Sequence, residues 1–267
     1  MRSFNKATFF IVAHMDDWQL FMNPIVAREL SYPENKVVLI HTTGNDAGYD
    51  LVHCFGKEAA TISSIHFGIS HLRNTNGFRN TIQINNHILH RWVGINIICY
   101  FLRLPDGNMN GNGFFNQGYQ SLHKLYHKEI NSIRTVDHTN IYHGWLDFVQ
   151  TLQKIIDYEV DGAFPTSIHY PETDHTINPD DHSDHRITGL AVQALPKLNQ
   201  YHCFAYIGYH LRNYPEDLSG IDLFWKIGQF VVYDRAFYTL SNYSIIKESQ
   251  SNYINFCLRA AKFRKLA

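Results

Sequence analysis

The sequence contains few cysteines and no close cysteine pair. Cys54, Cys99, Cys203 and Cys257 lie far apart, and none forms the Cys-x-x-Cys spacing of a structural zinc site. Their small number and wide spacing also argue against a dense disulfide framework. We therefore expect buried thiols in a reducing compartment.

The sequence also lacks an excess of charge and a long apolar run. Charged residues make up 18% of the chain and the net charge is −1, whereas nucleic-acid-binding proteins usually carry a basic excess that neutralises phosphates. We therefore discount DNA and RNA as partners. The first apolar run, residues 7–13, meets His14 too soon for a signal or membrane segment, so we expect a cytoplasmic protein.

Apolar runs alternate along the chain with segments in which apolar residues recur at helical spacing. Residues 36–43 are a continuous β-rich run, and residues 145–158 carry apolar side chains at the spacing of a helix. This alternation predicts an α/β fold, Rossmann-like, with a mainly parallel sheet covered by helices on both faces. There is no repeat of fixed period, so we expect a single domain over residues 1–267, with about residues 191–267 completing the fold and the substrate entrance.

Polar segments follow the predicted strands. Because ligands bind at the carboxyl ends of the strands in such sheets, we expect these segments to meet at one rim. They are residues 14–17, 44–50, 104–107 and 169–185.

Two of these segments are rich in metal-ligand side chains. One is His14-Met15-Asp16-Asp17, directly after the first apolar run, and the other is Asp181-His182-Ser183-Asp184-His185. A catalytic zinc ion typically has three protein ligands and keeps a fourth position open, and His14, Asp17 and His185 fit this description. Selectivity among first-row metals depends on geometry and availability, so another divalent ion also suits such a set.

The remaining residues of the two segments suit acid–base chemistry. Asp16, next to a predicted ligand, is a candidate general base that takes a proton from a metal-activated water. His182 lies three residues before His185 and is a candidate for stabilising a developing oxyanion as an imidazolium, with Asp184 holding its orientation. We therefore predict a metallohydrolase.

The two segments resemble a known family. Ala13-His14-Met15-Asp16-Asp17 is similar to the AHPDD motif, and His182-Ser183-Asp184-His185 to the HPDH motif, of the PIG-L (LmbE-like) N-acetylglucosamine deacetylase superfamily. Thr42-Thr43-Gly44 and Lys57-Glu58-Ala59-Ala60 resemble further family segments, and the match spans about residues 7–190. Met15 stands in place of the usual proline, Trp18 where a glutamate commonly follows, and Lys57 for an arginine.

The resemblance implies an LmbE-like deacetylase fold, a Zn²⁺ cofactor and the removal of an acetyl or related acyl group from the amide nitrogen of an N-acetylglucosamine-type conjugate. It implies the same roles: zinc ligands at His14, Asp17 and His185, a general base at Asp16, and His182 at the oxyanion with Asp184 as its orienter. The expected partner is a small amino-sugar conjugate; the acceptor group and the oligomeric state stay open.

Asp46, Asp106 and Trp18 are candidate substrate contacts. Asp106 stands in Pro-Asp-Gly, which is itself a turn sequence, and most aromatic residues at the spacing of Trp18 belong to a core. For these residues, a substrate contact and a purely structural role both remain open.

Three alternatives compete with the hydrolase. Asp16 and Asp17 could merely cap a helix that begins near Trp18. His182-x-Asp184 also has the form of the facial triad of non-haem Fe(II) oxygenases, which would need a distal histidine such as His210. A catalytically inactive carbohydrate-binding homologue is the third alternative.

Overall fold

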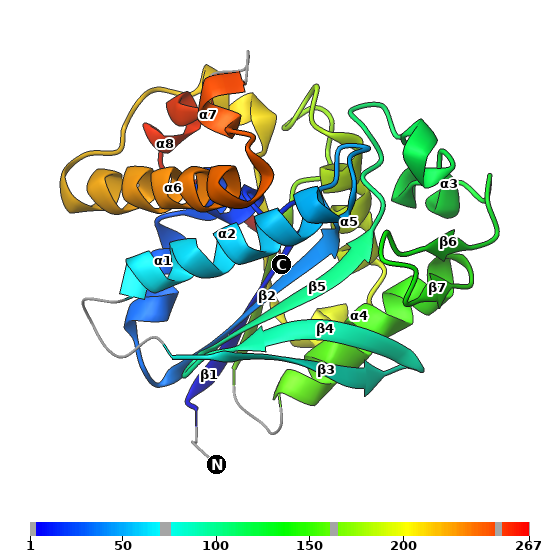
Figure 1. The fold of residues 1–267 in the computed structure, drawn as a ribbon. Helices are drawn as coiled ribbons and strands as arrows, with labels where there is room; N and C mark the ends of the chain where they lie inside the picture. The colour runs from blue at the N-terminus through cyan, green and yellow to red at the C-terminus, as the bar shows by residue number, and fades with distance from the viewer. Residues whose placement is uncertain (1–3, 70–75, 161–164, 249–252, 267) are drawn as a thin grey trace.

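A computed structural model describes residues 4–69, 76–160, 165–248 and 253–266. One mixed sheet of eight strands forms its centre (Figure 1). Strands β9, β8, β1, β2 and β5 run parallel to one another, whereas β10 and the β3–β4 hairpin are antiparallel to their neighbours. In spatial order the strands are β10 (Phe263–Leu266), β9 (His202–Tyr206), β8 (Thr166–Pro171), β1 (Lys6–Val12), β2 (Asn35–Thr43), β5 (Ile97–Leu104), β4 (His87–Val93) and β3 (Phe78–Ile84).

Helices cover both faces of this sheet (Figure 1). This confirms the expected α/β architecture with a mainly parallel sheet. One face carries α1 (Ile25–Ser31), α2 (Leu51–Ile69), α6 (Gly220–Ser241), α7 (Ile245–Glu248) and α8 (Ile254–Cys257). The other carries α3 (Leu122–Tyr126), α4 (Gly144–Val160) and α5 (Ser183–Gln193), with the small hairpin β6 (Ile133–Arg134) and β7 (Ile141–Tyr142) near them.

The central strands are apolar on both sides because both of their faces are covered. In β1, Phe10 and Val12 join the core beneath α2 and α6, whereas Phe9 and Ile11 join the core beneath α4 and α5. Successive side chains of a strand point to opposite faces, so a continuous apolar run supplies both cores at once. This explains why the strand reads as an unbroken apolar segment.

The segment after β8 is shorter than the expected polar stretch of residues 169–185. Strand β8 continues to Pro171, and α5 begins at Ser183. The helix starts here because His182 caps it: its Nδ1 accepts a hydrogen bond from the backbone N–H of Asp184. The second predicted motif therefore lies on the first turn of a helix.

The strand order creates a crevice at the carboxyl end of β1. This strand pairs with β2 on one side and with β8 on the other, so the chain changes direction across the sheet between β1 and β8. Ligands bind at such switch points in open α/β sheets. His14 follows β1 closely and α5 follows β8, so both predicted motifs lie at this crevice.

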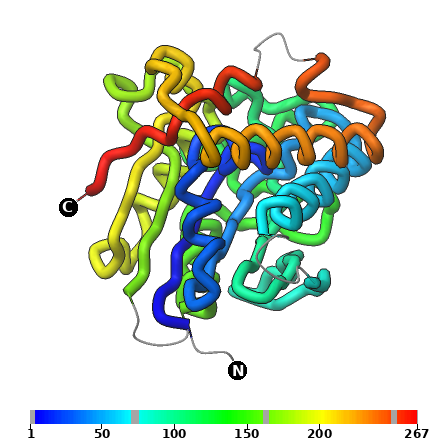
Figure 2. Tube along the Cα trace, turned by 90° about the vertical axis from the view of Figure 1, so that its left-hand side faces the viewer, coloured from blue at the N-terminus to red at the C-terminus, as the bar shows by residue number. Residues whose placement is uncertain are grey.

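The C-terminal segment contributes a strand to the sheet and helices to one of its faces. Strand β10 forms one edge of the sheet beside β9, and α6 lies alongside α2 (Figure 2). All four cysteines are buried and unpaired, which confirms the expectation of buried thiols. Among the described residues, no helix combines the length and the apolarity needed to cross a bilayer.

Candidate metal centre

Asp17 is held by the turn that leaves β1, and it does not act as a helix cap. It occupies the N-cap position of the π-helical turn Trp18–Met22 without making a side-chain capping bond. Its Oδ2 instead accepts the backbone N–H of His14 at 2.8 Å, which leaves Oδ1 directed at His185. The capping interpretation is therefore wrong for Asp17.

The structure brings the three predicted metal ligands together. His14 Nδ1 lies 3.0 Å from His185 Nε2, His185 Nε2 lies 3.0 Å from Asp17 Oδ1, and His14 Nδ1 lies 3.5 Å from Asp17 Oδ1. Three donors around one tetrahedral ion with bonds of about 2.0 Å are separated by about 3.3 Å. All three side chains are buried, so these donor atoms have the spacing and the shielding of a metal site.

A further carboxylate holds His185 in place. Asp181 Oδ1 lies 2.9 Å from His185 Nδ1 and also accepts the backbone N–H of Tyr209 at 3.0 Å, while Asp181 Oδ2 accepts from Asn178 Nδ2 at 2.7 Å. When Nδ1 carries the ring proton of a neutral His185, the lone pair of Nε2 faces the other two donors. Carboxylates commonly orient metal-binding histidines in this way. The sequence does not single out this role, although Asp181 stands four residues before His185.

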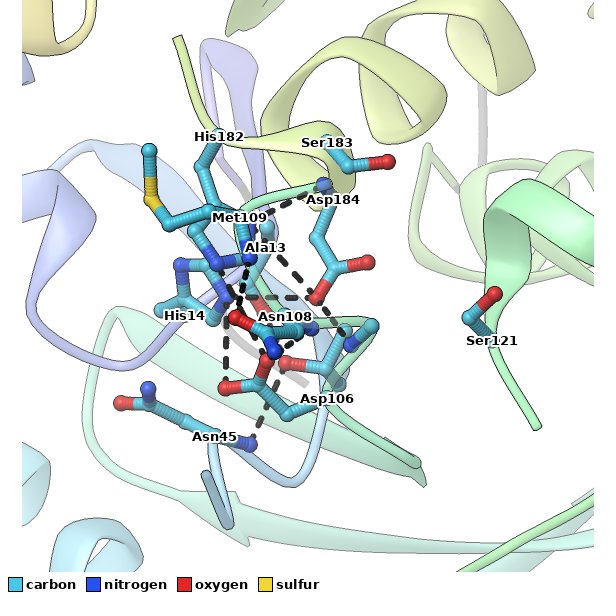
Figure 3. Close-up of polar contacts among 12 residues, drawn as sticks. Ala13, His14, Asn45, Asp106, Asn108, Met109, Ser121, His182, Ser183 and Asp184 are labelled. Atoms are coloured by element: carbon cyan, nitrogen blue, oxygen red, sulfur yellow. Dashed lines mark hydrogen bonds and ion pairs between the residues drawn. The ribbon is translucent and has the colours of Figure 1, made fainter. Parts of the chain in front are cut away.

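A second group of donors surrounds the other ring nitrogen of His14. His14 Nε2 lies 3.4 Å from Asp184 Oδ2 and 3.8 Å from Asp106 Oδ2, and His182 lies 3.8–3.9 Å from the same two carboxylates. Figure 3 shows these side chains facing one another. His14, Asp106, His182 and Asp184 are buried and could hold a metal ion. Three of these four separations exceed every distance among the donor atoms of His14, Asp17 and His185, so we favour the latter set.

The cluster stabilises positive charge. Burial lowers the pKa of His185, but the nearby Asp17 and Asp181 carboxylates outweigh it and raise this pKa to about 10. Burial opposes the charged form of His14 as well, and Asp17, Asp184 and Asp106 raise its pKa well above the usual value. Metal ions and protons compete for the same nitrogens, so a site that binds protons this strongly also suits a cation.

The surroundings of His182 disfavour its charged form. Burial, reinforced by the charge on His14, lowers its pKa to about 4. Because Nδ1 accepts the Asp184 N–H at 3.1 Å, a neutral ring carries its proton on Nε2, 3.9 Å from Asp106 Oδ1. These surroundings favour a neutral ring, with an N–H to donate at Nε2, over the expected imidazolium.

The carboxylate of Asp184 contacts Gly107 and His14, whereas it was expected to orient His182. Its Oδ2 accepts the backbone N–H of Gly107 at 2.8 Å and faces His14 Nε2. Asp184 holds His182 mainly through its backbone N–H, since its carboxylate is 3.8 Å from His182 Nδ1. Asp184 thus links the loop that follows β5, the His14 side chain and the start of α5.

A cavity of about 290 Å³ opens beside these residues. Asp16 lines it; burial raises the pKa of this carboxyl, and the Lys57 ammonium partly offsets the effect. Lys57 reaches the cavity from α2, with its Nζ 5.4 Å from the centre of the Phe237 ring. The lining residues are His14, Asp16, Asp17, Asn45, Ala47, Tyr49, His53, Lys57, Asp106, Asn108, Met109, Phe114, His182, Tyr209, Tyr243, Ile245 and Tyr253.

The three candidate substrate contacts have different positions. Asp106 lines the cavity and also forms a turn, because its Oδ1 accepts the backbone N–H of Asn108 at 2.8 Å. Asp46 is fully buried and accepts the backbone N–H groups of Asp106 and Gly48, so it holds the loops together instead of facing a ligand. Trp18 is fully buried in the core beneath α2 and α6. The predicted substrate contact is therefore wrong for Trp18 and Asp46.

Several cavity residues belong to no motif of the sequence. Tyr209, Tyr243, Ile245 and Tyr253 come from the C-terminal segment, which contains no recognisable motif. His210, the distal histidine required by the oxygenase alternative, belongs to neither donor group among the described residues and lies 3.0 Å from the Asn213 side chain. An iron oxygenase site built from His182, Asp184 and His210 therefore lacks its third ligand.

Comparison with protein-family models, curated proteins and solved structures gives no match to this chain. The similarity to the PIG-L superfamily therefore stays a prediction from the two motifs.

Proposed function

We propose that the protein is a metal-dependent hydrolase with an LmbE-like deacetylase fold, which removes an acetyl or related acyl group from an N-acetylglucosamine-type conjugate. The observation that carries this proposal is the separation of 3.0–3.5 Å among His14 Nδ1, Asp17 Oδ1 and His185 Nε2, at the edge of a cavity. The order of the two motifs and their position at the switch point of the sheet support it.

The donor set fits a divalent ion such as Zn²⁺. His14, Asp17 and His185 would hold it, and Asp181 would orient His185. When bound, such an ion supplies a Lewis acid that polarises an amide carbonyl and makes water more acidic. The three protein donors leave room for ligands from the cavity side.

Asp16 is suited to move the protons of amide hydrolysis. Its carboxylate lines the cavity, and Lys57 favours its charged form against the effect of burial. It would accept a proton from the attacking water and return it to the leaving nitrogen, which departs poorly without a proton. This is the role of a general base that then serves as a general acid.

His182 is suited to stabilise the amide oxygen. Its ring lines the cavity with its centre 4.5 Å from that of the His14 ring, and its Nε2–H is the group available for donation. A fixed donor that meets negative charge as it develops lowers the barrier of acyl transfer. Asp106, on the side of Nε2, would keep the ring in this tautomer.

Metal analysis combined with acetate detection tests the proposal. Purified protein should contain about one divalent ion per chain, and His185→Ala should remove it. Incubation with N-acetylglucosamine conjugates should release acetate, and Asp16→Asn should keep the ion while losing roughly 10²-fold or more in rate. Asp157→Asn, a surface carboxylate paired with Lys197, is the matched control.

The alternatives give different results in the same experiments. Sugar binding without acetate release would indicate an inactive carbohydrate-binding protein. Turnover that depends on 2-oxoglutarate and oxygen would indicate the iron oxygenase class. Full activity of Asp16→Asn would remove Asp16 from the general-base role.

A further inference from the structure

The cavity wall changes in chemistry from its inner to its outer end. The inner end holds the buried groups His14, Asp16 and Asp17. The outer end is formed by Tyr49 and Met109, which are 52% and 49% exposed, together with the half-buried rings of Phe114 and Tyr243. A ligand in this cavity therefore meets polar groups at one end and aromatic or apolar groups at the other.

Further exposed apolar residues lie close to Tyr49 along the chain and on the helix packed against α2. Leu51, Val52 and Phe55 stand on the first turns of α2, and Leu240 stands at the end of α6. These helix ends pack closely, because a Cβ at Gly56 would lie 3.7 Å from the Cβ of Leu240.

Beside the Tyr49 loop, Phe115 is 77% exposed, and its loop is joined to the Tyr49 loop by a hydrogen bond of 2.8 Å from Asn116 Nδ2 to Gly48 O. Single exposed apolar residues are ordinary, whereas a group of them around a cavity marks a binding surface.

The size of the cavity decides which part of a ligand meets this surface. About 290 Å³ is at the lower end of the range for ligand pockets, so the cavity holds the reacting part of a conjugate and leaves the rest at the mouth. Among the described lining residues, Lys57 is the one lysine or arginine, and it lies near the inner end beside Asp16. The outer wall thus offers no lysine or arginine to a phosphate or carboxylate.

We propose that the group attached to the amino sugar is uncharged and apolar, an alkyl or aryl group that lies against Tyr49, Phe114 and Tyr243. This inference rests on the proposed function, because the sugar must occupy the inner end for its attached group to reach these rings. Burial of an alkyl chain against this wall contributes affinity through the hydrophobic effect, and aromatic rings offer flat apolar contact area.

Calorimetric titration of three N-acetylglucosaminides tests this inference. The metal-loaded Asp16→Asn variant, in which turnover is slow, would be titrated with the octyl glycoside below its micelle concentration, the methyl glycoside and the 1-phosphate. We expect the octyl glycoside to bind at least about tenfold more tightly than the methyl glycoside, with a more negative heat-capacity change, and the 1-phosphate to show no gain. Equal affinity of the octyl and methyl glycosides, tighter binding of the 1-phosphate, or no binding of any of them would overturn the inference.

A pair of tyrosine variants controls for nonspecific effects. Tyr49→Ala should reduce the octyl preference several-fold, whereas Tyr32→Ala should preserve it, because Tyr32 is equally exposed, at 53%, but lies just before the amino end of β2. A loss of preference in both variants, or in neither, would contradict the proposed wall.

Acetate release, measured in parallel on the unchanged protein, separates this inference from the proposed function. Tighter binding of the octyl glycoside without acetate release from any glycoside would support the apolar wall and contradict the proposed hydrolase activity. Acetate release from both glycosides with equal affinity and equal kcat/KM would support the hydrolase and contradict the apolar wall.

Discussion

Replacing Asp181 by asparagine tests whether the buried histidines form a metal site. The Asp181 carboxylate accepts from three neighbours: His185 Nδ1, the backbone N–H of Tyr209, and Asn178 Nδ2. An asparagine keeps the shape but has one oxygen. If that oxygen stays on His185 and Tyr209, its NH₂ group faces the NH₂ group of Asn178.

The two facing NH₂ groups cannot be separated by turning the Asn178 amide without loss, because the Asn178 side chain already makes another hydrogen bond. Its Oδ1 accepts the backbone N–H of Gly208 at 3.2 Å, so turning its amide exchanges one mismatched pair for another. The variant also loses the negative charge that orients His185 and makes it a better ligand. Loss of such an outer carboxylate typically weakens metal affinity by about 10–100-fold, or about 1.4–2.7 kcal/mol.

The assay is competition for Zn²⁺ against a chelator of known affinity at pH 7. Asp181→Asn should show the loss of affinity, His185→Ala should show no specific binding, and the surface variant Asp157→Asn should match the unchanged protein. If Asp181→Asn and His185→Ala both keep the original affinity, the ion is not bound by this set of residues. The assignment of the metal centre would then be wrong.

Three further predictions concern stability. His185 has a pKa of about 10 in the folded chain against 6.5 when unperturbed, so its contribution is complete below pH 6.5 and disappears as pH rises towards 10; the melting temperature of the metal-free protein should fall over that range. Gly189→Ala would place a Cβ 2.3 Å from the carbonyl oxygen of Pro171, so it should push α5 away from β8, cost about 1–3 kcal/mol and weaken metal binding. Arg103→Ala should cost about 3 kcal/mol in urea unfolding, because it removes the bidentate partner of the buried Glu58 carboxylate and leaves the half-exposed Arg79 to pair with it.

Each of these has a control or a contradicting result. The metal-loaded protein should lose the alkaline destabilisation, since a metal-bound His185 has already given up its proton. Normal stability and metal affinity in Gly189→Ala would show that the contact between α5 and β8 does not position the site. Arg28→Ala breaks an exposed pair with Asp222 and should cost less than about 1 kcal/mol; an equal loss for Arg28→Ala and Arg103→Ala would contradict the importance of burial.

Local patterns were sufficient to predict the architecture and the position of the two motifs. The unbroken apolar run of β1 predicts a strand buried on both faces, and the polar residues after it predict a rim of ligands. The start of α5 at Ser183 has no common signal in the sequence, because histidine is not among the usual capping residues. His182 as a cap is visible only when the backbone N–H of Asp184 is seen to point at its ring.

Neighbours that are distant along the chain could not be predicted in this way. Trp18 resembles a possible sugar-stacking residue in the sequence, yet its turn directs it into the core beneath α6. Tyr243 and Tyr253 come from a segment with no motif, and they reach the cavity because α6 packs along α2. Such contacts depend on how helices pack across a sheet, which the local pattern does not encode.

The sequence by itself determined the alternation of strands and helices and the kinds of donor available, because periodicity and side-chain chemistry are local properties. Only the tertiary structure decided which atoms meet. It set the distances among His14, Asp17 and His185, turned the Asp184 carboxylate towards His14 and Gly107, and added Asp181 as the support of His185. The physical reason is that hydrogen-bond and metal-ligand geometry depends on separations of a few tenths of an ångström, and the packing of β1 against β8 and α5 sets those separations.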